Sequence, residues 1–598
     1  MGSITAVLSF SHRPARDLPE RGLRAAPHRG STIYTRSLSR FEVGIATSDA
    51  WHHQDATISE GAGTIVAVQG LIDNLPELQA RLRRAGKEPG STPADVVREL
   101  FLHEGERTPE LLRGMYAVVV SDGSRMWCFR DHLGFATLFY RQERDAIYVA
   151  TEAKQVAAAA GIGWRPDPDV AHAILHRDYD DETPAAIKGV ARLAKMTMLT
   201  AEPGRVRRRR YWRPEALIET RRSTPTELQE RFDELMTQAV RRSLTGAGDV
   251  LSLSAGLDSP ALAVYGAPEH LRLYGSPLAA ITTSYPHLPA VDERPYVEEL
   301  SRGLGLNLHV VERHVRFLEG LQEWVKVLDG PIPKISTNDA HEGYTQVREL
   351  GYRTMITGEI AEYLTDQRSA LIPYLTARGR FGPLWAQLRG ARAKGFGRGR
   401  LAKQVLLAFV PLGPERAYRR TQTRSDPTIP DWFTTPSLDV LDSYDPSVTP
   451  ARDRWATHQL SGFTGPGLSM ESDTIVQELC GIRVRRPWAD VDLWEFFLSL
   501  RAETKFPDTR RKGLARDLLT GRIPDFILQR KGKVVFDDSI MERIDYVGLR
   551  AWLVDSDVRV DGVDYTLLEK HLADEDFGLW DHIWAKDLAA VHAFLALG

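Results

Sequence analysis

The chain of 598 residues contains little cysteine, no long apolar run and no excess of charge of either sign. Two cysteines cannot build a disulfide framework, and neither belongs to a Cys/His cluster with zinc spacing. Apolar stretches such as Val405–Leu412 are too short to span a bilayer, and the first residues do not read as a signal peptide. A net charge of −3 gives no general field that would attract nucleic acid or a membrane. We therefore expect a cytoplasmic protein that uses neither as a partner.

The first third of the chain, from residue 31 to about 159, is rich in short strand-like segments. Turn residues separate these runs of β-branched and aromatic residues, and strands outnumber helices, which predicts a layered α+β domain. The expected strands are Ile65–Gln69, Tyr116–Val120, Met126–Arg130 and Ile147–Thr151, and the expected helices cover residues 75–85 and 93–103.

A strand, a tight turn and a helix are predicted around residues 251–264. Small residues in the turn let the backbone approach a ligand, and free N–H groups at the start of the helix favour an anion. Pro260 suits the first helical turn, where its missing N–H does no harm. The Gly-Lys-Ser/Thr signature of the other common phosphate loop is absent. The candidate anion-binding residues are Leu253, Ser254, Ala255, Gly256, Leu257, Asp258 and Ser259.

Strands and helices alternate after this turn. A helix over residues 226–243 precedes it, strands at 278–284 and 308–311 follow it, and a helix ending near Leu304 lies between them. This alternation predicts a doubly wound parallel sheet. Ligands bind such sheets at the carboxyl ends of the strands, where the turn would lie.

Two segments resemble the ATP-pyrophosphatase domain of asparagine synthetases. Ser254–Ser259 is similar to the Ser-Gly-Gly-x-Asp-Ser pyrophosphate loop, and Met355–Glu362 is similar to the Ser-Gly-Glu-Gly-Ala-Asp-Glu segment. The resemblance implies ATP bound by the first loop and by Gly358, with Glu359 catalytic and Mg²⁺ held by Asp258 and Glu362. Magnesium in such sites takes one or two carboxylates together with phosphates.

Three positions depart from the family pattern. Ala255 and Ile360 replace glycines, and Glu362 is one methylene longer than the usual aspartate. Alanine is tolerated if its φ is negative, and glutamate can still ligate a metal. We expect a working ATP site, and a degenerate one is the alternative.

The first third also resembles the class II glutamine amidotransferase domain of asparagine synthetases. The similar segments are Gly70–Asn74, Leu112–Ala117, Phe129–Gly134 and Thr151–Lys154, in the family order. Those enzymes use an N-terminal cysteine whose own α-amine is the base. Here Gly2 follows Met1, Cys128 has the setting of a core residue, and Cys480 is remote. We expect no glutamine hydrolysis.

A lysine near the C-terminus completes the resemblance. Arg486–Asp490 and Ile523–Asp538 are similar to the family's last conserved segments, and alignment on Phe536 makes Lys533 the catalytic lysine. Lys531, two residues away, remains the alternative. A fixed ammonium would stabilise charge at the α-phosphate and on a tetrahedral oxyanion.

These observations divide the chain into two domains. Residues 1–205 form the expected glutaminase-like layered domain, and residues 222–598 form the synthetase-like α/β domain with helical additions. The basic run Arg205–Arg210, followed by an aromatic pair, is interpreted as part of the linker rather than a nucleic-acid site. An insertion at about 374–426, rich in basic, glycine and aromatic residues, is either a mobile loop or a lid for an acidic or peptidic substrate.

Two further acidic positions fit the family only loosely. Asp292–Glu293 begins a predicted helix, and we expect capping alone to explain it. Asp329 lies near the position of a family acidic residue, but Asp-Gly-Pro is also ordinary turn chemistry.

Chain length, the Arg-Lys-Gly-Lys-x-x-Phe segment and the long C-terminal tail resemble lasso peptide cyclases within this family. The resemblance implies adenylation of an Asp or Glu side chain of a precursor peptide, whose own α-amine then closes a macrolactam. A leader peptidase or a leader-binding protein would be a further partner. The alternatives are a β-lactam synthetase-like or ammonia-dependent enzyme acting on a small substrate, and a pseudo-synthetase without turnover.

Overall fold

The computed structural model describes most of the chain. Lys531 and Lys533 fall outside the described residues, so the predicted catalytic lysine cannot be placed. The described residues are 2–598 without 12–16, 49–54, 177–178, 180–182, 315, 332–336, 411–427, 434–453, 461–466 and 531–536.

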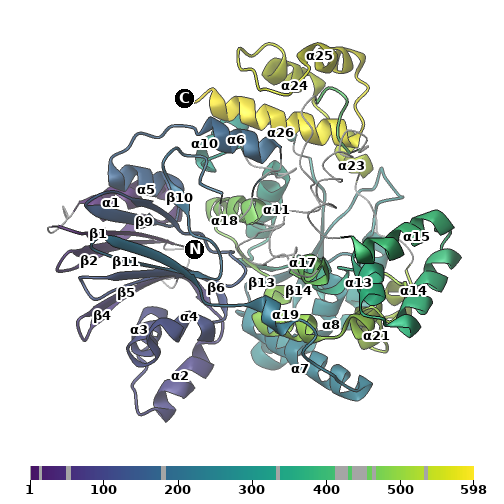
Figure 1. The fold of residues 1–598 in the computed structure, drawn as a ribbon, viewed down its shortest axis with the longest axis horizontal. Coiled ribbons are helices and arrows are strands. Elements are labelled where there is room, and N and C mark those ends of the chain that lie inside the picture. The colour runs from purple at the N-terminus through teal and green to yellow at the C-terminus, as the bar shows by residue number, and fades with distance from the viewer. Residues whose placement is uncertain are drawn as a thin grey trace.

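Two six-stranded sheets pack face to face in the amino-terminal domain (Figure 1). Helices α1 and α5 cover the outer face of one sheet, and α2, α3 and α4 lie below the other. The strand orders are β10-β8-β9-β1-β3-β2 and β12-β11-β7-β6-β5-β4. The strands are β1 (Ser3–Ser9), β2 (Thr32–Leu38), β3 (Phe41–Thr47), β4 (Ala56–Gly61), β5 (Thr64–Ile72), β6 (Gly114–Ser121), β7 (Met126–Arg130), β8 (Phe139–Gln142), β9 (Ala146–Ala150), β10 (Ala191–Arg192), β11 (Thr197–Glu202) and β12 (Arg205–Arg210). The helices are α1 (Leu18–Arg24), α2 (Leu75–Arg84), α3 (Pro93–Glu104), α4 (Thr108–Leu111), α5 (Ala153–Ala160) and α6 (Pro168–Leu175).

The structure corrects one element boundary of this domain. The basic run Arg205–Arg210 is strand β12, which pairs antiparallel with β11 at the edge of the second sheet. The linker interpretation rests on the aromatic pair Tyr211-Trp212 that follows the run, as in the segment joining the two domains of asparagine synthetase-like chains. Its arginines are mostly exposed, and charged side chains on an edge strand hinder pairing with another chain.

Five parallel strands form the sheet of the carboxy-terminal domain, in the order β15-β14-β13-β16-β17. This confirms the predicted doubly wound sheet. Helices α11 and α18 pack on one face, while α7, α8, α9 and α19 pack on the other. The strands are β13 (Asp249–Ser252), β14 (Ala279–Thr283), β15 (Asn307–Val311), β16 (Thr354–Ile356) and β17 (Arg483–Arg485). The helices are α7 (Pro225–Ser243), α8 (Asp258–Tyr274), α9 (Arg294–Leu304), α11 (Thr337–Glu349), α18 (Gly467–Cys480) and α19 (Val491–Ser499).

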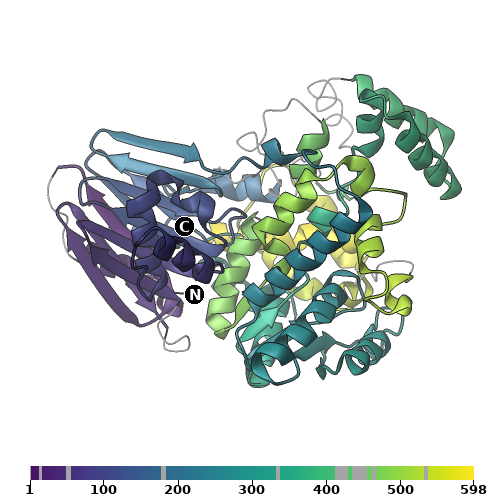
Figure 2. The ribbon, with the colours of Figure 1, turned by 90° about the horizontal axis from the view of Figure 1, so that it is seen from below.

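Two groups of helices are added to this sheet domain. One gathers around the long helix α26 with α6, α10, α24 and α25 (Figure 1). The other is the arm, defined as α14 with α15, which projects from the body at the upper right of Figure 2. The arm occupies the part of the predicted insertion that the structure describes, and it is helical there rather than an irregular loop. No described helix is long and apolar enough to cross a membrane. The bounds are α10 (Leu321–Val327), α12 (Ala361–Thr365), α13 (Leu371–Ala377), α14 (Phe381–Ala393), α15 (Arg398–Leu406), α17 (Arg454–Leu460), α20 (Ala502–Lys505), α21 (Gly513–Leu519), α22 (Asp525–Leu528), α23 (Asp537–Met541), α24 (Tyr546–Leu553), α25 (Tyr565–Asp574) and α26 (Leu579–Leu595).

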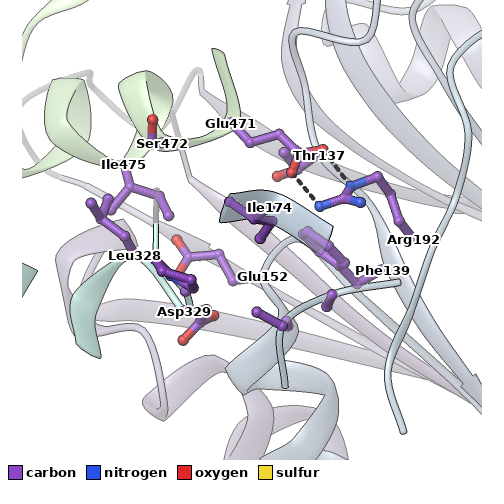
Figure 3. Close-up of a pocket in the computed structure, with 15 residues that line it drawn as sticks. Thr137, Phe139, Glu152, Ile174, Arg192, Leu328, Asp329, Glu471, Ser472 and Ile475 are labelled. Atoms are coloured by element: carbon purple, nitrogen blue, oxygen red, sulfur yellow. Dashed lines mark hydrogen bonds and ion pairs between the residues drawn. The ribbon is translucent and has the colours of Figure 1, made fainter. Parts of the chain in front are cut away.

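The two domains meet across a buried, charged interface. Arg192 donates two hydrogen bonds, of 2.8 and 2.9 Å, to the carboxylate of Glu471 on α18. Figure 3 shows this pair beside a small cavity of about 50 Å³ that residues of both domains line. Asp329 lies here as well, 3.3 Å from the Lys154 ammonium. The structure therefore places Asp329 in the domain interface.

Candidate active site

The two signature loops lie side by side at the carboxyl edge of the parallel sheet. They follow β13 and β16, which are neighbours in the sheet because the chain reverses its direction of strand addition between them. A Cβ on Gly358 would stand 2.8 Å from the backbone nitrogen of Ser259. Only glycine allows the loops to approach this closely, which accounts for the glycine at this position.

The first loop is closed by its own hydroxyl groups. Ser259 Oγ accepts a hydrogen bond from the Ser254 backbone N–H at 3.0 Å, and the two hydroxyl oxygens are also 3.0 Å apart. Helix α8 begins at Asp258, so the positive end of the helix dipole faces the loop. The geometry suits an anion such as a nucleotide phosphate.

The residues that replace family glycines adopt different conformations. Ala255 is not among the described non-glycine residues with positive φ, so alanine fits there without strain. Ile360, in contrast, has φ of 65°, the left-handed conformation that favours glycine. Such a β-branched residue stores roughly 1–3 kcal/mol of strain. Ile360 is also buried, and its packing offsets part of that strain.

Glu293 is part of the site, which corrects the expectation that capping alone explains Asp292–Glu293. It makes no side-chain capping bond to α9. Instead its carboxylate accepts from the Ala255 backbone N–H at 3.0 Å and from Arg530 at 2.6 Å. Arg530 also donates to the Ala255 carbonyl at 3.0 Å. Glu293 and Arg530 thus bind the backbone N–H and the backbone carbonyl of Ala255.

A cavity of about 460 Å³ opens between the two loops. Asp258 and Glu362, the predicted magnesium ligands, both line it. Among the described residues no cluster of three or more metal-ligating side chains occurs. The pair still fits magnesium, because two carboxylates suffice when phosphates complete the shell. Other predicted residues on its wall are Ser254, Ala255, Gly256, Leu257, Ser259, Gly358 and Glu359.

Leu253 lies on the far side of the first loop. It is buried, and it lines an adjoining cavity of about 150 Å³ together with Thr282 and Thr283 at the end of β14. The two cavities share Ser252, Ser254, Glu293 and Met355. The two cavities therefore adjoin each other across the first loop.

Four cations that sequence reasoning missed also line the larger cavity. They are Arg511, Lys512, Arg516 and Arg530. Lys512 forms an ion pair with Asp258. Within their own segment these residues look like an ordinary basic turn, so only the tertiary contact identifies them. A concentration of positive charge beside an anion loop is the environment that a triphosphate requires.

Glu359 is oriented by a buried arginine. Arg486 Nε donates to Glu359 at 2.7 Å, and Arg486 Nη2 donates to Asp473 at 2.6 Å. Tyr344 in turn donates to Asp473 at 2.9 Å. The Glu359 side chain is 42% exposed to the cavity, whereas that of Arg486 is 1% exposed. Burial lowers the pKa of Arg486, but Glu359 and Asp473 outweigh it and raise the pKa above its usual value.

The amino-terminal domain has no space for a nucleophile at position 2. A Cβ on Gly2 would stand 2.2 Å from the Ala46 carbonyl oxygen. Cys128 lies inside β7 as a core residue, and burial raises the pKa of its thiol. Cys480 is also buried.

Comparison with known proteins finds two family matches along the chain. The asparagine synthase family matches residues 231–594, and the glutamine amidotransferase domain family matches residues 1–212. "Asparagine synthetase [glutamine-hydrolyzing] 3" of Bacillus subtilis (strain 168) is 25% identical over 85% of this chain and 81% of its own length. "Amidase chry2" of Gibberella zeae is 25% identical over 50% of this chain and 46% of its own length.

Similarity to solved structures is weaker. A glutamine phosphoribosylpyrophosphate amidotransferase from B. subtilis is 14% identical, covers 53% of this chain and 82% of its own length, and has a TM-score of 0.28. The fold assignment therefore rests on the strand orders and the family matches. The asparagine synthase match covers more than half of the chain and includes both signature loops. The chain belongs to the asparagine synthase family and is an ATP-dependent amide ligase of the asparagine synthetase type.

Proposed function

We propose that this ligase activates a side-chain carboxylate of a peptide and joins it to the peptide's own α-amine, closing a macrolactam ring. The observation that carries the proposal is the cavity in which the anion loop, Glu359 and four cations face one another. The lack of space at Gly2 and the burial of both cysteines favour an amine that does not come from glutamine.

The reaction takes place in two steps. A carboxylate oxygen of the peptide bonds to the α-phosphorus of ATP as the bond to pyrophosphate breaks. The amine then bonds to the acyl carbon, the bond to AMP breaks, and the amine loses a proton. Glu359, exposed to the cavity and aimed by Arg486, is the group placed to accept that proton.

The cations on the wall serve the first step. Lys512 and Arg516 would neutralise the leaving pyrophosphate, and Arg530 keeps the Ala255 peptide in place. Asp258 and Glu362 would hold Mg²⁺, which screens the phosphate charges when bound. The predicted Lys533, or Lys531 in its place, would stabilise the oxyanion of the second step by about 3 kcal/mol.

The arm supports a peptidic substrate. From Phe381 to Leu406 the chain has six basic residues and no acidic one. Phe381 and Trp385, one turn apart on α14, are 72% and 64% exposed. Exposed cations and aromatic rings together suit a peptide that carries carboxylates and apolar side chains.

A loop connects the arm to the cavity wall. Gln387 of α14 donates to the carbonyl oxygens of Phe506 and Asp508, at 2.9 and 3.1 Å. That loop continues directly into Arg511 and Lys512 on the cavity wall. A peptide on the arm would therefore reach the reacting centre.

The test uses the purified chain with a linear peptide that carries an internal Asp or Glu, ATP and Mg²⁺. We expect AMP, pyrophosphate and a product lighter by one water. The same peptide with an acetylated N-terminus should still release pyrophosphate when hydroxylamine is present as a trap, but should form no ring. Pyrophosphate release that requires a free amine would contradict the two-step scheme.

The second candidate is ammonia-dependent amidation of a small carboxylate, which the match to an asparagine synthetase favours. Asparagine formed from aspartate and ammonium, without ring closure of any peptide, would establish it in place of the cyclase. ATP binding without pyrophosphate release for every carboxylate would indicate a pseudo-synthetase.

A further inference from the structure

The amino-terminal domain makes direct contact with the arginine that orients Glu359. The guanidinium carbon of Arg486 lies 5.2 Å from the centre of the Phe135 ring, which belongs to the other domain. Phe135 is 3% exposed. A desolvated guanidinium is attracted to an aromatic face, so the ring both shields Arg486 from water and restricts its orientation.

Phe135 is itself held by a carboxylate. Asp131 accepts hydrogen bonds from four backbone N–H groups of the turn that carries the ring, at 2.7 to 3.1 Å. This turn follows β7 and contains the Arg-Asp-His-Leu-Gly segment by which the domain resembles a glutaminase. Its rigid geometry is therefore used at the domain interface.

A second contact with the amino-terminal domain fixes Arg485, the residue before Arg486. Arg485, at the end of β17, donates to Asp73 of the amino-terminal domain at 2.6 Å and to the Arg242 carbonyl at 2.6 Å. Asp73 follows directly after β5. The amino-terminal domain thus contacts both Arg485 and Arg486, and Arg486 also binds Glu359.

We infer that the amino-terminal domain acts as a positioning part of the synthetase centre, in which Asp73 and Phe135 fix Arg485 and Arg486 and thereby aim the Glu359 carboxylate into the cavity. The inference rests on the role proposed for Glu359. It assigns a use to a domain that has no space for its nucleophile.

The decisive measurement separates the two half-reactions in Phe135→Leu, which keeps apolar bulk but removes the π face. We expect ATP–pyrophosphate exchange and the KM for ATP to stay within about twofold, while the rate of amide formation falls roughly tenfold to a hundredfold. Phe135→Tyr, which keeps the ring, should restore the rate. Asp73→Asn should reproduce the defect in weaker form.

Lys154→Met is the matched control. It breaks another buried contact between the domains, with Asp329 at 3.3 Å, that makes no contact with Arg486. It should lower thermal stability at least as much as Phe135→Leu and leave the ratio of the two half-reactions unchanged. If both variants slow the two steps equally, the domain is only a structural support and the inference fails.

Hydrogen exchange tests the inference without any turnover. Backbone amides of residues 358–362 should exchange faster in Phe135→Leu than in the unchanged chain, and not faster in Lys154→Met. This result would stand even if no substrate were amidated, so failure of the proposed function and failure of the positioning inference are distinguishable. Equal exchange in all three proteins would overturn it.

Discussion

At the scale of single residues, the departures from the family pattern follow from local geometry. Ala255 is buried, does not have positive φ, and is pinned by Glu293 and Arg530. Ile360 adopts a left-handed conformation that favours glycine, and its side chain is buried. The two loops thus accommodate both replacements, Ala255 without backbone strain and Ile360 with some.

Restoring the family residues should change adenylation little. Glu362 and Asp258 both line the cavity, and either carboxylate type can ligate Mg²⁺. Ala255→Gly and Glu362→Asp are each expected to leave ATP–pyrophosphate exchange within about threefold of the unchanged chain, a difference below about 0.7 kcal/mol. A gain of more than about tenfold in either variant would show that the natural site is degenerate.

Lys505 on α20 should make stability depend on pH. Its ammonium is 2% exposed and donates to Gln459 at 2.5 Å, and burial lowers its pKa from 10.5 to about 7. The pKa of Lys505 is lower in the folded chain than in the unfolded chain. The destabilisation caused by burying the charged ammonium is therefore greatest below about pH 7 and disappears as the pH rises towards 10.5.

Lys505→Met should therefore stabilise the folded chain near pH 7 by about 2 kcal/mol, which raises its melting temperature. The difference in melting temperature from the unchanged chain should narrow towards pH 10. Thermal denaturation followed by circular dichroism over this range provides the measurement. A constant difference at all pH values would mean that packing, rather than the buried charge, causes the change.

At the scale of elements, the sequence is sufficient to predict a helix, strand or turn where its pattern is local. The strand-turn-helix around Ser254–Ser259 and the second loop were predicted from their residues, and the alternation of strands and helices placed both at the carboxyl edge. Glu293 and Lys512 were missed because capping or a basic turn explains their local patterns equally well. Lys512 and Asp258 are 254 residues apart, and only the folded sheet brings them together.

The arm allows a direct test of substrate recognition. Trp385→Ser combined with Arg389→Ser removes an exposed ring and an exposed charge from one face of α14. We expect the KM for the peptide to rise about tenfold, with kcat and the KM for ATP unchanged, because only ground-state binding is lost. Arg83→Ser, an exposed arginine on α2, is the control. Equal loss in both proteins would exclude a specific role for the arm.

At the scale of the whole molecule, the interface between the domains carries buried charge that the sequence did not indicate. Glu471 serves two arginines of the other domain, Arg192 at 2.8 Å and Arg130 at 3.6 Å. Both guanidinium groups are at least 95% buried. Each domain can be predicted from its own sequence pattern, but ion pairs between the two domains leave no pattern among neighbouring residues.

Removing Glu471 should therefore destabilise the chain more than removing Arg192. Glu471→Gln removes the carboxylate that two buried guanidinium groups share and leaves Arg192 without its hydrogen-bonded anion, so we expect a loss of about 3–5 kcal/mol. Arg192→Met leaves Glu471 paired with Arg130, so a loss of about 1–2 kcal/mol is expected. Chemical denaturation of both variants is the measurement. A larger loss of stability in Arg192→Met than in Glu471→Gln would contradict the shared role of Glu471.

The close packing around Gly2 also bears on how this chain can evolve. A single codon change could place cysteine there, yet its Cβ would overlap the Ala46 carbonyl oxygen and stand 2.8 Å from the Ala56 side chain. A cysteine side chain would fit there only if β3 and the start of β4 shifted away from it. A point mutation to cysteine at this position would therefore need compensating changes around it before the thiol could fit.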